Sequence, residues 1–320
     1  MSSPLISKYL AYTGGVKRYS SRTQAVYREI LEQYENFAAP EPVLEALCGP
    51  VLRSYEVWLM DEKGVGARTV GLHMSVLSGF CRWLVAQGEL ASNPVRTLPR
   101  PKTEKRLPVF YREESMDDYF EQTALYGSEE VLGLFSGRPG DRADIQLYTR
   151  VLQRLIISIL YSTGIRRSEL IGLNRRSFDS SRHVMHVLGK GDKMREIPLT
   201  GTICREILLY LHAIDKMGIE VDAADSPLLV TRSGKRLYPV LVDRAVKEEL
   251  GTVPEITSRK SPHVLRHTLA TELLDEGTDL NSIKELLGHS SLAATQVYTH
   301  NSIEKLKKVY NSAHPRAAKK

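Results

Sequence analysis

Residues 163–170 read TGIRRSEL, and they end the strongly apolar segment that precedes them. That segment, residues 146–161, carries leucine and isoleucine at helical spacing, which predicts a helix in the protein core. Gly164 stops such a helix, and Arg166 and Glu169 follow directly. Polar side chains that come straight after a stiff, buried element are well placed to form a site, because positioning depends on rigid support.

Four further motifs follow in order toward the C-terminus. They read GKGDK at residues 189–193, HVLRH at 263–267, LGHSS at 287–291 and VYTH at 297–300. The candidate site residues that these motifs supply are Arg166, Lys190, His263, Arg266, His289 and Tyr298. Arginine offers the planar, bidentate donors that a phosphate needs, and a tyrosine can form a covalent intermediate when its surroundings activate it. The set therefore suggests phosphoryl transfer through a covalent phosphotyrosine, and no acidic cluster for a metal accompanies it.

The composition describes a globular protein with a negatively charged partner. The 320 residues leave room for two domains, and 42% hydrophobic with 26% charged residues is typical of a folded protein. A net charge of +6 and a pI of about 9.1 favour a polyanionic partner.

Location is inferred from what the chain lacks. No apolar run reaches the length of a membrane span, and residues 1–12 lack the basic-then-apolar order of a signal peptide. Cys48, Cys81 and Cys204 are far apart and odd in number, which is typical of reduced thiols rather than of disulfides or a metal site. We therefore expect a cytoplasmic protein with no membrane insertion.

We expect residues 1–97 to form a helical domain. Apolar spacing and turn residues predict helices that run from the cap region at residues 20–23 to Phe37, over 51–60 and over 69–87. Residues 98–112, rich in proline, arginine and lysine, are predicted to be a linker.

Residues 113–320 form the second predicted domain, in which helices surround a small sheet. Strands are predicted over 183–188 and 196–199, on either side of the turn at residues 189–192. Beyond the apolar helix at 146–161, further helices are predicted over 203–216, 241–250, 265–275 and 281–287, whereas 126–142 lacks periodicity and reads as a loop or insertion. The expected fold class is mainly α with a small antiparallel β-sheet.

The basic residues around the linker have two interpretations. They can be a solvated connector, or a strap that lies across DNA phosphates, and the second interpretation gains weight once the candidate site is considered. The residues expected to contact phosphates are Arg96, Arg100, Lys102, Lys105 and Arg106.

The ordered motifs resemble the tyrosine site-specific recombinase (integrase) family, and most closely its bacterial Xer members. The resemblance runs from about Tyr19 to Ala317, nearly the whole chain. Each motif alone is weak, but all of them in one order make a chance match very improbable. The resemblance implies a helical core-binding domain (1–97) and a catalytic domain (113–320) that close around duplex DNA as a clamp.

The resemblance also implies a role for each site residue. Tyr298 is the nucleophile that forms a 3′-phosphotyrosyl intermediate. Arg166 and Arg266 clamp the scissile phosphate together with His289. Lys190 protonates the departing 5′ oxygen, and His263 removes the proton of Tyr298. Glu169 orients or caps, because a free carboxylate would repel the phosphate. The chemistry requires neither metal, nucleotide nor other cofactor.

Taken singly, these residues also fit ordinary structural roles. A lysine in a glycine-flanked turn is commonly just exposed, and Lys193 is the nearest substitute for Lys190. His263 and Arg266 lie three residues apart and fit one salt-bridged face of a helix end. Zinc is a rival ligand for the histidines, although no cysteine or carboxylate set completes its coordination. Tyr298 is one of fifteen tyrosines, and taken alone it also fits a half-buried tyrosine of the core.

Several functions remain open beyond the family resemblance. The first is Xer-type resolution of chromosome dimers by a homo- or hetero-tetramer on two specific DNA sites, with a paralogous recombinase or a protein activator as further partners. The others are a mobile-element integrase or invertase, a monomeric topoisomerase of relaxing type, and a non-catalytic architectural DNA-binding protein. A helical tail over residues 301–311 would dock on its own domain or on a neighbouring protomer.

Overall fold

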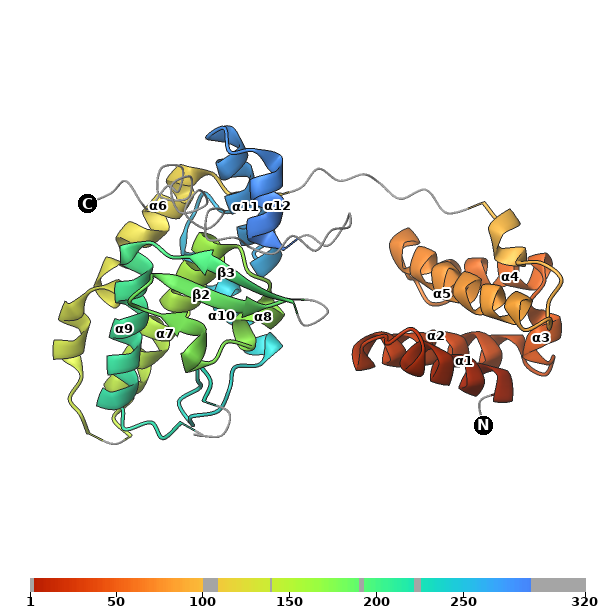
Figure 1. The fold of residues 1–320 in the computed structure, drawn as a ribbon, viewed down its shortest axis with the longest axis horizontal. Coiled ribbons are helices and arrows are strands. Elements are labelled where there is room, and N and C mark those ends of the chain that lie inside the picture. Colours follow the sequence, from red (N-terminus) through yellow and green to blue (C-terminus); the bar gives the residue numbers. More distant parts are fainter. Residues whose placement is uncertain (1–2, 100–108, 139, 190–192, 222–225, 289–320) are drawn as a thin grey trace. The chain divides into compact units, whose positions relative to one another are not determined.

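The chain folds into two compact units. The computed structural model describes residues 3–99, 109–138, 140–189, 193–221 and 226–288. The units are Met1–Arg106 and Leu107–Lys320, and each has its own hydrophobic core (Figure 1). The division falls inside the segment 98–112, and the roles assigned to the domains 1–97 and 113–320 stay predictions.

The first unit is built from helices. They are α1 (Pro4–Gly15), α2 (Ser21–Ala38), α3 (Val43–Ala46), α4 (Gly49–Asp61), α5 (Ala67–Ala86) and the 3-10 helix η1 (Pro94–Thr97). Helix α2 starts where expected, because the Ser20 side chain accepts a hydrogen bond from the Thr23 backbone N–H. The three helices predicted in this unit are confirmed to within two residues at each end.

Helix α1 is missing from the prediction, although four of its residues are buried and follow helical spacing: Ile6, Tyr9, Leu10 and Thr13. The Tyr9 ring packs against Phe80 and Trp83 of α5, with ring centroids 5.2 Å and 5.6 Å apart. This contact makes α1 part of the core of the first unit.

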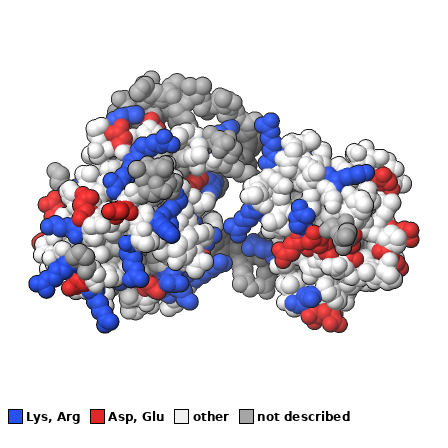
Figure 2. All heavy atoms as spheres, turned by 90° about the horizontal axis from the view of Figure 1, so that it is seen from below, with Lys and Arg blue, Asp and Glu red and all other residues white. Residues whose placement is uncertain are grey.

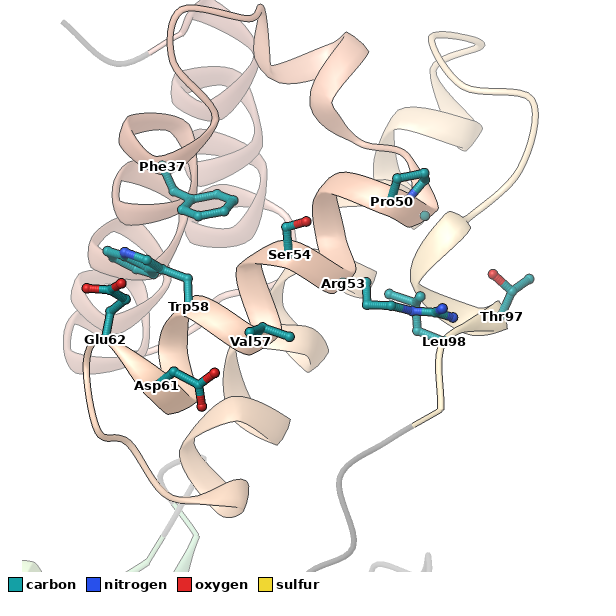
Figure 3. Close-up of a pocket in the computed structure, with 11 residues that line it drawn as sticks. Phe37, Pro50, Arg53, Ser54, Val57, Trp58, Asp61, Glu62, Thr97 and Leu98 are labelled. Atoms are coloured by element: carbon teal, nitrogen blue, oxygen red, sulfur yellow. The ribbon is translucent and has the colours of Figure 1, made fainter.

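A hollow opens on the first unit between α2, α4 and η1 (Figure 3). Phe37 and Trp58 form its apolar wall, with ring centroids 5.2 Å apart, and Val57 beside them is 52% exposed. Leu98 lies on its rim, so the segment that joins the two units starts beside the hollow.

The second unit combines helices with one sheet. Its elements are α6 (Glu113–Gln122), η2 (Ala124–Gly127), η3 (Glu129–Leu134), α7 (Arg142–Thr163), α8 (Arg167–Ile171), η4 (Arg175–Ser177), β1 (Phe178–Asp179), β2 (Val184–Leu188), β3 (Met194–Pro198), α9 (Gly201–Lys216), α10 (Pro239–Glu249), η5 (Leu250–Thr252), α11 (Pro262–Asp275) and α12 (Leu280–Leu287). The helices predicted between residues 146 and 287 are confirmed, and so is the fold class, mainly α with a small antiparallel sheet.

Helix α7 lies at the centre of the second unit. It packs against α9, α10 and α11, and every residue from 154 to 163 is buried, as expected for a helix surrounded on all sides. Gly164 ends it in the left-handed conformation, with φ at +60°, and its N–H donates to Leu160 O at 3.0 Å. The motif at residues 163–170 therefore begins on the most buried element of the unit.

The sheet has the order β1-β2-β3 and is antiparallel throughout. Both predicted strands are present, and β2 and β3 pair so that Val187 faces Arg195. The prediction lacks β1, which is only two residues long and carries no alternating pattern. Lys190 and the rest of the turn that joins β2 to β3, residues 190–192, lie outside the described residues.

The prediction of a structureless segment over 126–142 is wrong in part. The short 3-10 helix η3 lies within it and buries Val131. Helix α7 starts at Arg142 rather than near residue 146, because the Asp141 side chain accepts hydrogen bonds from the Ala143 and Asp144 backbone N–H groups. Polar capping thus extends a helix that apolar spacing alone starts too late.

Among the helices that the structure describes, none combines the length and apolar character that crossing a bilayer would demand.

A test of the junction at Gly164 uses a second glycine as its control. A Cβ at Gly164 would lie 2.5 Å from Leu287 Cδ2, whereas one at Gly218, which has the same φ of +60°, meets nothing within 4 Å. We expect Gly218→Ala to lower the free energy of unfolding by about 1 kcal/mol, the cost of left-handed backbone alone. Gly164→Ala should lower it by about 3 kcal/mol, because overpacking is added.

Urea unfolding followed by circular dichroism measures both values. Equal losses in the two variants would show that Leu287 moves aside without cost.

Candidate active site

Arg166 and Glu169 form a compact pair at the start of α8. Arg166 is the N-cap residue, and its backbone N–H donates to Glu169 Oε2 at 2.9 Å, while its Nη1 donates to Oε1 at 2.7 Å. The Glu169 carboxylate therefore caps the helix and holds the Arg166 side chain in one orientation. The Arg166 side chain stays 32% exposed, so it can still meet a ligand.

A third member of the cluster, Arg195, is absent from the sequence prediction. It lies on β3 and is only 6% exposed. Its Nη1 and Nη2 donate to Glu169 Oε1 and Oε2 at 3.2 Å and 2.8 Å, a bidentate pair. The Glu169 carboxylate thus accepts four hydrogen bonds from two arginines. Burial raises the pKa of Glu169, but the hydrogen bonds from Arg195 and Arg166 outweigh it and hold the pKa below its usual value.

The arginines converge on the C-terminal end of α12. Each donates to one of its last carbonyl oxygens: Arg195 Nε to Leu286 O at 3.2 Å, Arg266 Nη2 to Leu287 O at 2.6 Å and Arg166 Nη2 to Gly288 O at 2.9 Å. These carbonyls have no partner within a helix, and the helix dipole makes them partly negative. Three segments far apart in the sequence are therefore held at one point, directly before His289.

Arg266 lies on α11 and is 7% exposed. Its Nη1 donates to Gly164 O at 2.6 Å, so it also joins α11 to the end of α7. Burial, and then the positive charge of Arg166, lower the pKa of Arg266 to about 10. The guanidiniums of Arg166, Arg195 and Arg266 thus lie close enough to repel one another, and with the single carboxylate of Glu169 they form a cluster with surplus positive charge.

His263 lies on the same helix as Arg266, one turn earlier, and is exposed. Although the residue as a whole is exposed, partial burial of its imidazole, and then the positive charges of Arg167 and Arg266, lower the pKa of His263 below the usual value. A lowered pKa favours the neutral imidazole, which is the form that can accept a proton. Arg167 in turn forms an ion pair with Asp243 of α10.

The structure brings together only part of the predicted site. Arg166, Glu169, His263 and Arg266 are placed as described above. Lys190, His289 and Tyr298 lie outside the described residues, as does the predicted helix over 301–311. One signal in the sequence could have identified Arg195. It is an arginine at an inward-facing position of a strand, where an apolar residue is usual, and it pairs with the buried Val187.

The predicted phosphate contacts of the linker fall mostly outside the structure. Arg96 is exposed on η1 of the first unit. The other four lie in the undescribed segment 100–108: Arg100, Lys102, Lys105 and Arg106. On the second unit, Figure 2 shows lysine and arginine side chains spread over the visible face, with isolated acidic ones between them. Such a surface suits a polyanion.

No metal centre is found within the part of the chain that the structure describes. Histidine, cysteine, aspartate and glutamate side chains do not gather there in groups of three or more that could hold an ion. Cys48, Cys81 and Cys204 are free thiols, as predicted.

Comparisons with known proteins place this chain in a family. Residues 144–305 match the family described as Phage integrase family. The chain is 32% identical over 323 residues to a protein named Tyrosine recombinase XerC from Chlorobaculum parvum, covering 98% of this chain and 94% of the relative. It is 35% identical over 315 residues to a protein of the same name from Mycobacterium sp. (strain KMS), covering 97% of both.

A solved structure shares the fold. It is the crystal structure of the XerH site-specific recombinase bound to palindromic difH substrate, a post-cleavage complex. The TM-score is 0.67 at 19% identity, and the match covers 95% of this chain and 82% of the other.

The lowered pKa of His263 gives a direct test. Histidine signals followed by NMR between pH 5 and 8 should show His263 titrating below about 6.5, the ordinary value. Arg167→Gln should move the midpoint upward, because it removes the charged neighbour with the largest effect on this pKa. Arg182→Gln, whose side chain pairs with Glu196 on the sheet, serves as the matched control and should leave the midpoint in place. If Arg167→Gln leaves the titration midpoint of His263 unchanged, Arg167 is not a cause of the lowered pKa.

Proposed function

We propose that this chain, which belongs to the phage integrase family and is a site-specific tyrosine recombinase of the Xer type, cleaves DNA by attack of Tyr298 on a scissile phosphate. The Tyr298 oxygen forms a bond to phosphorus, and the bond between phosphorus and the 5′ oxygen breaks. The product is a 3′-phosphotyrosyl linkage. Because the linkage stores the phosphodiester energy, the reverse attack by a 5′ hydroxyl rejoins a strand without ATP.

The arginine cluster is the observation that carries this proposal. Arg166 and Arg266 come from segments about one hundred residues apart, yet both guanidiniums donate to adjacent carbonyls at the end of α12. Arg166 and Arg195 share the Glu169 carboxylate, and the Arg266 guanidinium nearby adds a third positive charge, so the cluster favours an anion. Planar guanidiniums bind the non-bridging oxygens of a phosphate in bidentate fashion and stabilise the charge that grows in a phosphorane-like transition state.

Proton transfers are assigned to the neighbouring residues. Tyrosine is mostly protonated at neutral pH, so its proton must leave as the new bond forms. His263, whose pKa is lowered by burial and by the neighbouring arginines, is the proposed base. Lys190 is the proposed acid that protonates the 5′ oxygen, and His289 adds a hydrogen bond to the phosphate.

The biological setting is proposed from the relatives. The two relatives are tyrosine recombinases by name, and the XerH site-specific recombinase is bound to its difH substrate, which supports recombination at specific DNA sites. We propose a tetramer that closes clamp-like around two duplexes in the cytoplasm. Resolution of chromosome dimers, with a second copy or a paralogous recombinase as partner, is the proposed role.

The nucleophile is tested by removing one hydroxyl. Tyr298→Phe should bind the target DNA with near-normal affinity but form no covalent adduct, since little besides the reacting oxygen is lost. The measurement is a denaturing gel after incubation with a nicked suicide substrate, with a gel shift as the control for binding. A surviving adduct would assign the reaction to another residue.

The phosphate clamp is tested by conservative changes. Arg166→Lys and Arg266→Lys should each lower single-turnover cleavage by about 100-fold or more, because an ammonium lacks the planar fork and loses one preorganised donor. Arg182→Lys, which alters an arginine–glutamate pair on the sheet, is the matched control and should cleave like wild type. Wild-type rates in both site variants would rule out the clamp.

A further inference from the structure

We propose that Arg195 is a positioning residue for DNA cleavage, which holds the segments that carry Arg166, Lys190 and His289. The inference deepens the proposed function and rests on it.

The first step is the burial of Arg195. In β3 its neighbour Met194 is 59% exposed, whereas Arg195 points inward and is 6% exposed. A buried guanidinium costs several kcal/mol unless partners compensate it. Here Nε, Nη1 and Nη2 all donate hydrogen bonds, so the side chain is held in one orientation.

The second step links Arg195 to Arg166 through Glu169. Glu169 Oε1 accepts from Nη1 of both arginines, and Oε2 accepts from Arg195 Nη2 and from the Arg166 backbone N–H. The carboxylate is thus fixed from two sides. If Arg195 is removed, Arg166 is the one partner that Glu169 keeps among these contacts. The Glu169 carboxylate can then draw the Arg166 guanidinium away from a phosphate.

The third step links Arg195 to the end of α12. Its Nε donates to Leu286 O, and a Cβ placed on Gly288 would lie 3.2 Å from both Cζ and Nη1 of Arg195. Gly288 therefore packs on the guanidinium itself, in the left-handed conformation with φ at +64°. The next residue in the chain is His289.

The fourth step links Arg195 to the base of the β2–β3 turn. A Cβ on Gly189 would lie 3.4 Å from Arg195 Nη1, and the Gly189 N–H donates to Lys193 O at 2.8 Å. The residue after Gly189 is Lys190. One side chain therefore lies beside the residue before the proposed acid and the residue before His289, and it binds the carboxylate that orients Arg166.

The test is the variant Arg195→Lys in the full-length protein. It keeps the positive charge but loses the bidentate fork and the Nε donor. At saturating DNA, we expect adduct formation on a nicked suicide substrate to slow by about 100-fold, the size of effect that small misplacements of catalytic groups produce. DNA affinity should stay within about three-fold of wild type, because Arg195 is buried and out of reach of DNA.

A second readout separates positioning from simple loss of structure. Replacing one non-bridging oxygen of the scissile phosphate by a methyl group removes the negative charge that Arg166 and Arg266 face. If Arg195 acts by placing the clamp, the gap between wild type and Arg195→Lys should shrink to about 10-fold or less on this methylphosphonate substrate. A variant that is merely less folded loses the same factor on both substrates.

Arg182→Lys is the matched control. Arg182 forms a bidentate pair at the surface with Glu196, which follows Arg195 in β3. It should match wild type on both substrates. Two results would overturn the inference while the proposed function stands. One is a wild-type cleavage rate for Arg195→Lys. The other is an equal loss of rate on both substrates, accompanied by lost folding or lost DNA binding. Absence of any adduct with the wild-type protein would instead defeat the proposed function, and the inference with it.

Discussion

The four hydrogen bonds that Glu169 accepts from Arg166 and Arg195 are the interaction on which the polar centre of the second unit depends. A carboxylate buried without partners is expensive, and breaking a buried ion pair by removing one partner commonly costs about 3–5 kcal/mol. The pKa of Glu169 stays low in spite of burial, so the carboxylate remains charged at neutral pH and both guanidiniums keep their partner. A neutral hydrogen-bond acceptor at this position could not offset the repulsion between two arginines.

Close packing around two glycines gives this interaction its geometry. Gly164 leaves room for Leu287 of α12, and Gly288 leaves room for the Arg195 guanidinium, so the end of α7 and the end of α12 approach more closely than residues with a Cβ would allow. Both glycines also adopt positive φ. Arg266 then joins the two helix ends by donating to Gly164 O and Leu287 O. The end of the most buried helix in the unit thereby sets where α12 stops and where the following segment begins.

The sequence reveals those parts of this arrangement that depend on local pattern. Apolar spacing and capping residues predict most helices, and the motifs around Arg166 and Arg266 are enough to identify both arginines. Arg195 is missing from the prediction, because its partners Glu169 and Leu286 lie 26 and 91 residues away in the sequence. Strand alternation marks its position as inward, and an arginine there conflicts with the usual apolar pattern; that conflict is the readable signal. Strand β1 is missed because a strand of two residues is too short to show an alternating pattern. The early start of α7 is missed because a polar cap at Asp141 extends the helix beyond its apolar stripe.

The cluster also shows why a site of this kind is not arranged for stability alone. Arg166 and Arg195 share the carboxylate of Glu169, and Arg266 adds a third positive charge close by. The carbonyls at the end of α12 offset only part of the remaining charge, since a helix terminus supplies about half an elementary charge. The charges of Arg166 and Arg195 both lower the pKa of Arg266, which means that the folded protein bears repulsion among the three guanidiniums. A phosphate bound between Arg166 and Arg266 would relieve that repulsion, so folding of the second unit and binding of DNA favour each other. Replacing the cluster by well-packed apolar residues would remove this repulsion together with the proposed phosphate clamp, so the cluster is not the arrangement that stability alone would favour.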